Sequence, residues 1–412
     1  MPQGYLFDAA RTEHLTAQSA MAACNEKQQA IVQDGKYYVV DIDDFPEPPY
    51  ALLGRDKRLE HECVLTTLSF SGGRQSTWVL EAIIRGDLPK PENFLVVTAD
   101  TGAERRSTYR VIERYQAKCA SAGIDMVIAD GPNMEQDLKD IQAGEKSRID
   151  NPPLFTRAEC DEVMSYEDHV AAVKGQGLTF ATFSELFKAN ENRYTPTKGM
   201  LRRKGQLAQC CTSHYKVRPI RRAIRSKLKE ITGSGKTWPG IAETYIGFAR
   251  HEWGRAVKAA QDVQWQRLRF PMIEHDISAN RVHEDWKRWH LPQPGISMCK
   301  CCPFSGLRRL KEMHELWTLH CEYLFGDVPP DAPAWDDLSP ERQQEIEDGA
   351  KDWSEAVDMD MTLRRFKNAG VEREVYTNQS LMPLLVLAEL EFDVKDPAVQ
   401  EELTCDSGLC FM

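Results

Sequence analysis

The sequence predicts an α/β fold, a doubly wound parallel sheet followed by a mainly helical C-terminal region. Three apolar runs carry this prediction, at Val64–Phe70, Asn93–Asp100 and Ile124–Ala129. The first two each lead into a turn and then a helical stretch, and strand–loop–helix units repeating at roughly 30-residue spacing are typical of parallel sheets. With 412 residues, 42% of them apolar, the chain can bury a sizeable core in one large domain or two.

The turn after the first strand is the most informative segment of the chain. It consists of small and polar residues where a helix begins, so its amides would have no helical partners and would face an anion, aided by the helix dipole. Glycine lets the backbone approach a phosphate closely. A Walker A loop needs a different pattern, and an ordinary turn is the alternative. We expect phosphate or sulfate oxygens to contact Ser71, Gly72, Gly73, Gln75, Ser76 and Thr77.

A second turn follows the second strand, and a helix is expected after it from about Arg105 to Ala122. Ligands of doubly wound sheets bind at the carboxyl ends of the strands, where both turns would lie. We therefore expect a nucleotide to be bordered by Asp100, Thr101 and Gly102.

The chain divides into three regions. Residues 1–60 are a lead-in with a candidate strand at Lys36–Ile42. Residues 61–305 form the nucleotide-binding domain, interrupted by a polar insert at 133–193. Residues 306–412 are expected to be mainly helical and to end in a cysteine-containing tail. Within them, Ser339 followed by Pro340 is typical of a helix start.

Charge is unevenly distributed along the chain. The net charge of −11 argues against a general binder of nucleic acid or anionic membranes. No apolar run is long enough to span a bilayer, and the N-terminus lacks the features of a signal peptide, so we expect a cytoplasmic protein without a membrane partner.

Residues 198–229, in contrast, contain eleven Lys/Arg and no Asp or Glu. This run is either a solvated helix face or a patch for the phosphates of a nucleotide or a nucleic acid. The candidates for neutralising anions are Arg202, Arg203, Lys216, Arg218 and Arg222.

Twelve cysteines in a reducing compartment indicate metal or redox chemistry more than disulfides. A Cys-Cys pair and a distant Cys-x-x-Cys supply four thiolates, the number that a [4Fe–4S] cluster needs. Structural zinc and no metal at all are the alternatives. The candidate ligands are Cys210, Cys211, Cys299 and Cys302, and Cys301 could replace a neighbour.

These motifs resemble the PAPS-reductase-like group of the PP-loop, or adenine-nucleotide α-hydrolase, superfamily, which includes phosphoadenosine phosphosulfate (PAPS) reductases. The similarity is greatest to bacterial and phage proteins described only as PAPS-reductase-like. The SGGxxS loop at 71–76 and the Asp-Thr-Gly at 100–102 carry it, and the cysteine pair followed by Lys-x-x-Pro is similar to adenylyl-sulfate reductases. Further similar segments lie at 199–203, 209–212, 245–249 with Glu252 and Arg255, 269–274, 285–286, 299–304, 379–384 and the Cys405/Cys410 tail.

The resemblance implies an adenine nucleotide ligand (ATP, PAPS or adenylyl sulfate) and sulfur reduction or transfer with a thiol reductant or a sulfur-donor protein. Reductases of this kind use a nucleophilic cysteine near the C-terminus, a position that Cys405 or Cys410 would take. ATP pyrophosphatases of the superfamily have Asp where this chain has Gln75. An Asp favours a Mg²⁺-assisted mechanism, so Mg²⁺ would here require Asp100, Glu104 or another carboxylate.

Three functions are compatible with these patterns. The first is a PAPS-reductase-like enzyme doing sulfur chemistry with an iron–sulfur cluster. The second is an ATP-dependent enzyme that thiolates or otherwise modifies nucleic acid through the basic run 198–229. The third is a regulatory or defence module that senses nucleotide or redox state without catalysis.

Overall fold

The computed structural model describes the greater part of the predicted core and of the C-terminal region. The described residues are 62–140, 142–146, 211–233, 240–252, 255, 256, 259, 263, 265–302, 307–364, 375–378 and 383–389. Of residue 141 and of the strand residues 13–14, 28–33, 36–41, 155–156, 194–197, 200–203, 365–368 and 371–374, only the backbone is described.

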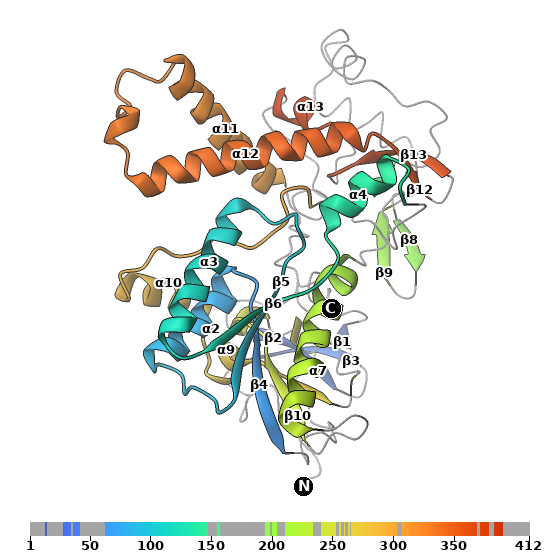
Figure 1. Cartoon of the computed structure of the whole chain (residues 1–412), viewed down its shortest axis with the longest axis vertical. Helices are drawn as coiled ribbons and strands as arrows, with labels where there is room; N and C mark the ends of the chain where they lie inside the picture. The colour runs from blue at the N-terminus through green and yellow to red at the C-terminus, as the bar shows by residue number, and fades with distance from the viewer. Residues whose placement is uncertain are drawn as a thin grey trace.

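A five-stranded, all-parallel sheet forms the centre of the molecule (Figure 1), in the order β11-β10-β4-β5-β6. From β4, the strands β5 and β6 follow on one side, and the later strands β10 and β11 lie on the other side of β4. Adjacent strands β4 and β10 therefore mark the point where the order reverses, which is where doubly wound sheets bind ligands. The bounds are β4 Cys63–Ser69, β5 Phe94–Ala99, β6 Asp125–Ala129, β10 Ile241–Tyr245 and β11 Gln266–Arg269.

Helices cover both faces of this sheet, which explains why the central strands β4 and β5 are largely buried. Alternate residues of β5 show the two faces: Phe94 and Val96 pack with α2 (Arg74–Arg85) and α3 (Arg106–Ser121). Leu95 and Val97 pack on the opposite side with α7 (Arg218–Thr232). The short helices α9 (Pro271–Glu274) and α10 (Ala279–Arg288) extend the first layer. The predicted doubly wound α/β fold is thus present.

Small antiparallel sheets lie outside the centre. In the lead-in, β3 (Lys36–Asp41) matches the expected strand and pairs with β1 (Glu13–His14) and β2 (Gln28–Gln33). The insert contains α4 (Met134–Gln142) and β7 (Phe155–Thr156). A hairpin of β8 (Tyr194–Thr197) and β9 (Met200–Arg203) follows.

The C-terminal region is mainly helical, as predicted. It contains α11 (Leu307–Phe325), α12 (Pro340–Thr362) and α13 (Leu384–Glu389). Ser339 Oγ accepts a hydrogen bond from Arg342 N at 3.2 Å, which confirms the expected start of α12. The strands β12 (Arg365–Asn368) and β13 (Val371–Tyr376), which join β7 in one sheet, were not expected.

Ion pairs attach α12 to the core. Arg106 of α3 lies 2.8 Å from the buried Asp352 and also pairs with Glu355. Glu355 is shared with Lys300, whose Nζ lies 2.5 Å from it and 2.9 Å from Glu135 of α4. Next to these pairs, Arg110 binds Asp348. No helix among the described residues has the length and apolarity that a bilayer crossing requires.

Candidate functional site

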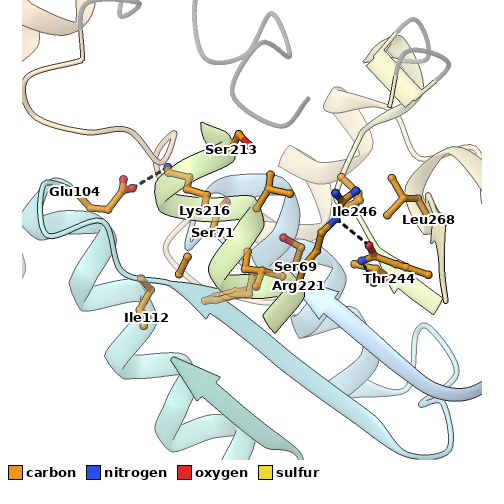
Figure 2. Close-up of a pocket in the computed structure, with 15 residues that line it drawn as sticks. Ser69, Ser71, Glu104, Ile112, Ser213, Lys216, Arg221, Thr244, Ile246 and Leu268 are labelled. Carbon is orange, nitrogen blue, oxygen red and sulfur yellow. Dashed lines mark hydrogen bonds and ion pairs between the residues drawn. The ribbon is translucent and has the colours of Figure 1, made fainter. Parts of the chain in front are cut away.

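A cavity of about 190 Å³ opens where the strand order reverses, at the carboxyl ends of β4, β5, β10 and β11 (Figure 2). It is closed from one face of the sheet by α7 and by the preceding π-helical turn η4 (Thr212–Val217). Such π-helical turns are frequent at functional sites. The cavity is lined by Ser69, Phe70, Ser71, Ala99, Glu104, Ile112, Ser213, Lys216, Val217, Ile220, Arg221, Thr244, Ile246, Gln266 and Leu268.

The first turn forms the strand–loop–helix expected from its sequence, with Ser71 at the cavity. Gly72 has a φ of +70°, and a Cβ on it would lie 3.1 Å from Thr108 O, so both conformation and space require glycine. The first i→i−4 bond of α2 runs from Thr77 N to Gly73 O at 3.0 Å. The amides of Gln75 and Ser76 precede it, as an anion site at a helix start requires.

The hydroxyls of this turn bond largely within it. Ser76 Oγ accepts from Ser71 N at 3.2 Å and lies 3.1 Å from Ser71 Oγ. Thr77 Oγ1 donates to Gly73 O at 2.8 Å. Ser76 and Thr77 therefore shape the turn, and Ser71 is the member that reaches the cavity.

Gln75 connects the turn to a neighbouring segment. Its side-chain amide donates to the carboxylate of Glu252, which also accepts Ala249 N at 2.9 Å and pairs with Arg255. Burial of Glu252 raises its pKa above the ordinary value. Gly247 comes so close that a Cβ on it would lie 2.7 Å from Ser76 N. Gln75 thus secures the start of α2.

The second turn lies beside the cavity without lining it. Asp100 Oδ1 accepts Gly102 N at 2.8 Å and the hydroxyl of Tyr109 at 2.7 Å. Burial, and then Asp100, raise the pKa of Tyr109. Gly102, at φ +72°, leaves no room for a Cβ against Asn133. Asp100 and Gly102 therefore shape the turn, while the adjacent Glu104 faces the cavity.

Glu104 is the centre of a buried polar cluster at one end of the cavity. Its Oε1 lies 2.8 Å from Lys216 Nζ, accepts from Thr101 Oγ1 at 3.2 Å and contacts Cys299 Sγ at 3.7 Å. Its Oε2 is buried and has no hydrogen-bond partner among the described residues. Burial acts to lower the pKa of Lys216, but the charge of Glu104 outweighs it and the pKa is raised.

The second polar end lies over β10 and β11. Gln266 Nε2 donates to Thr244 Oγ1 at 2.7 Å, and Gln266 Oε1 accepts from Arg221 Nε at 3.3 Å. Thr67 Oγ1 of β4 donates to Thr244 Oγ1 at 2.9 Å. Between the two ends the walls are apolar, formed by Phe70, Ile112, Val217, Ile220, Ile246 and Leu268. This arrangement suits a ligand with a flat apolar body and polar ends.

Three cysteines gather next to this cavity. Cys299 pairs with Glu104 as an antiparallel bridge, supported by Lys300 N to Ala103 O at 2.9 Å. Cys211, Cys299 and Cys301 share one apolar cluster. Burial raises the pKa of each of these thiols, that of Cys301 to about 12.

The predicted metal ligands are only partly described. Among the described residues, no three Cys, His, Asp or Glu side chains are placed to hold one metal ion. Cys210 lies outside those residues, as do Cys405 and Cys410 of the tail. Cys302 is buried in the same segment, and its amide donates to Cys299 O at 3.2 Å.

The basic residues proposed from the sequence separate in space. Lys216 lines the cavity, whereas Arg218 and Arg222 are exposed on α7. Arg202 and Arg203 lie on β9, and their side chains are outside the described part of the structure. The cationic residue that lines the cavity from α7 is Arg221, which sequence reasoning missed together with Thr244 and Gln266.

No protein-family model matches the chain, and no curated protein matches it.

Proposed function

We propose that this chain is an adenine-nucleotide-binding enzyme of the PAPS-reductase-like kind, carrying out sulfur reduction or transfer. The observation that carries the proposal is the cavity at the reversal of strand order, with Ser71 of the glycine-rich turn on its wall. A helix start that can bind phosphates, next to an apolar cavity that can hold a ring system, is the arrangement that a nucleotide-binding site needs.

In this proposal the nucleotide's phosphates lie on the amides of the first turn, and its ring system enters the slot between the aliphatic side chains. Arg221 and Lys216 stand at the two ends of the slot. An arginine and a lysine in a largely apolar cavity interact strongly with polar ligand groups, because little water screens them. ATP, PAPS and adenylyl sulfate are the candidate ligands.

The thiols beside the cavity are the type of ligand that iron–sulfur clusters and zinc prefer. Cys211, Cys299 and Cys302, together with Cys210, would hold a [4Fe–4S] cluster or, alternatively, zinc. When bound, the cluster would supply one-electron redox chemistry. Metal binding would also replace the protons that burial retains on these thiols. Cys405 or Cys410 stays the predicted reactive thiol.

The test of nucleotide binding is calorimetric titration of the intact protein with ATP, PAPS and adenylyl sulfate. Ser71→Ala should lower the affinity about tenfold, because a hydrogen bond to a charged group contributes about 1.5 kcal/mol. Ser121→Ala is the matched control, since Ser121 is exposed and its hydroxyl donates within its own helix, to Ala117 O at 3.0 Å. Equal affinities of the two variants and the wild type would contradict the proposal.

A second candidate, ATP-dependent modification of nucleic acid, is favoured by one observation. The exposed residues of α7 include Arg218, Arg222, Arg225 and Lys229, spaced along one face of the helix. A basic stripe of this kind suits a phosphate backbone. Release of pyrophosphate from ATP that requires added tRNA or DNA would favour this candidate over the first. Tight nucleotide binding without turnover would instead favour a sensing module.

A further inference from the structure

The two carboxylate oxygens of Glu104 are used unequally. Oε1 has three neighbours, the donors of Thr101, Lys216 and Cys299. Oε2 has none among the described residues, although the residue is only 4% exposed. A buried carboxylate oxygen without a donor costs free energy, and buried polar atoms nearly always have partners. A donor for Oε2 is therefore expected.

The cavity is where that donor can come from. Glu104 is one of its lining residues and is paired with Lys216, a second lining residue, at one end of it (Figure 2). Apolar side chains such as Phe70, Ile112 and Val217 form much of the lining and carry no donor. An ordered water needs several polar partners, and these walls offer few. A ligand group that donates a hydrogen bond is the occupant that the surroundings favour.

Charge limits what this group can be. A second phosphate or sulfate at Glu104 would meet a carboxylate in a weakly screened environment, and Lys216 is already paired with that carboxylate at 2.8 Å. A divalent cation would meet the Lys216 ammonium instead. A neutral hydroxyl or amino group avoids both repulsions and satisfies Oε2.

We infer that Glu104 selects the ligand of this cavity by accepting, at Oε2, a hydrogen bond from a hydroxyl or amino group of the bound nucleotide. This inference rests on the proposed function and deepens it. It assigns to Glu104 a role in specificity, and it makes a nucleotide with a free donor at this position the preferred ligand. A nucleotide that carries an additional anion there is rejected.

The test uses the intact wild-type protein and a series of adenosine 5′-monophosphate analogues in calorimetric titrations. The 2′-deoxy, 3′-deoxy and 3′-phosphorylated analogues probe a ribose hydroxyl, and inosine 5′-monophosphate probes the base amino group. An analogue that lacks the group donating to Glu104 should bind about 10- to 100-fold more weakly, because it loses a hydrogen bond to a charged acceptor. One arm of the series should show this loss and thereby identify the group.

Glu104→Gln provides the second readout. It can place an amide donor at the position of Oε2, so the difference in affinity between adenosine 5′-monophosphate and the weakened analogue should shrink or reverse. If the base amino group is the donor, the variant should bind inosine 5′-monophosphate more tightly than the wild type does. Glu113→Gln, an exposed position on the following helix α3, is the control and should leave the whole series unchanged. Thermal unfolding checks that both variants are folded, and if Glu104→Gln is not, the wild-type series decides alone.

Two failures can be told apart. If the wild type binds adenosine 5′-monophosphate and Ser71→Ala weakens that binding, but all analogues bind equally, the role of Glu104 is wrong and the proposed function stands. If the wild type binds no adenine nucleotide, the proposed function fails and this inference fails with it.

Discussion

Asp360, near the end of α12, holds three segments of the C-terminal region together. Its carboxylate is 1% exposed and accepts from Thr377 N at 3.3 Å, Thr377 Oγ1 at 2.8 Å, Leu384 N at 3.1 Å and Arg364 Nη2 at 2.8 Å. It thereby bonds the first amide of α13 and the residue after β13. Replacement by alanine would remove the acceptor of four donors at once.

The expected cost of Asp360→Ala is about 3–5 kcal/mol in the free energy of unfolding, because removing one partner of a buried ion pair leaves the other partner without compensation. The lost backbone and hydroxyl bonds act in the same direction. The control is Asp358→Ala on the exposed side of the same helix, expected to change stability by less than about 0.5 kcal/mol.

Unfolding in guanidinium chloride, followed by the fluorescence of tryptophans such as the buried Trp353, measures this difference. Hydrogen exchange gives a local readout, since the amides of Thr377 and Leu384 should lose protection in Asp360→Ala and keep it in Asp358→Ala. A loss of stability below about 1 kcal/mol with unchanged exchange at both amides would refute the reasoning.

Three further predictions follow from the contacts described above. Burial acts to raise the pKa of Glu355, but hydrogen bonds from its two cationic partners outweigh it and lower the pKa from 4.5 to about 2. Its contribution, about 1 kcal/mol after allowance for partial exposure, is present above pH 4.5 and lost as the pH falls towards 2. The stability difference between wild type and Glu355→Gln, measured against pH, should shrink over that window, and a constant difference would contradict this. Gly72→Ala should cost about 1–2 kcal/mol in stability and weaken nucleotide binding. Gly86→Ala, at φ +82° with open space around it, should lower stability while titrations show unchanged affinity. Cys299→Ser should lower the iron and sulfide content of protein purified without oxygen, whereas Cys321→Ser on α11 should keep it, and equal contents in both variants would argue against the proposed ligands.

The strands β4, β5 and β6 and the helices α2 and α3 were predicted from local sequence, and for β4 and β5 burial on both faces accounts for the apolar run. The strand β10 was not predicted, although it is central in the sheet. The same rule explains why other strands were missed. The strand β11, Gln-Arg-Leu-Arg at 266–269, lies at the edge of the sheet and carries charged and polar side chains. The strands β12 and β13 are likewise polar in sequence, and the pairing of β13 with β7 joins residues more than 200 positions apart. No local pattern encodes such pairing.

The candidate site shows the same division between local and distant information. Ser71 and Lys216 were expected and line the cavity, because each belongs to a recognisable local motif. On α7 the expectation was one residue off: Arg222 is exposed and Arg221 lines the cavity. Successive helical residues point about 100° apart, so a basic run alone cannot show which arginine faces inward. Gln266 had no motif at all and reaches the cavity only through strand order.

The ion pairs between α12 and the core have a consequence for any attempt to dissect the protein. The sequence suggested a boundary near residue 305, but a fragment ending there would leave Arg106, Arg110 and Lys300 without the α12 carboxylates that neutralise them. These three side chains, no longer neutralised by α12, would bind polyanions without specificity. A truncated protein would therefore overstate affinity for nucleic acid, and its binding data would describe the cut surface instead of the native site.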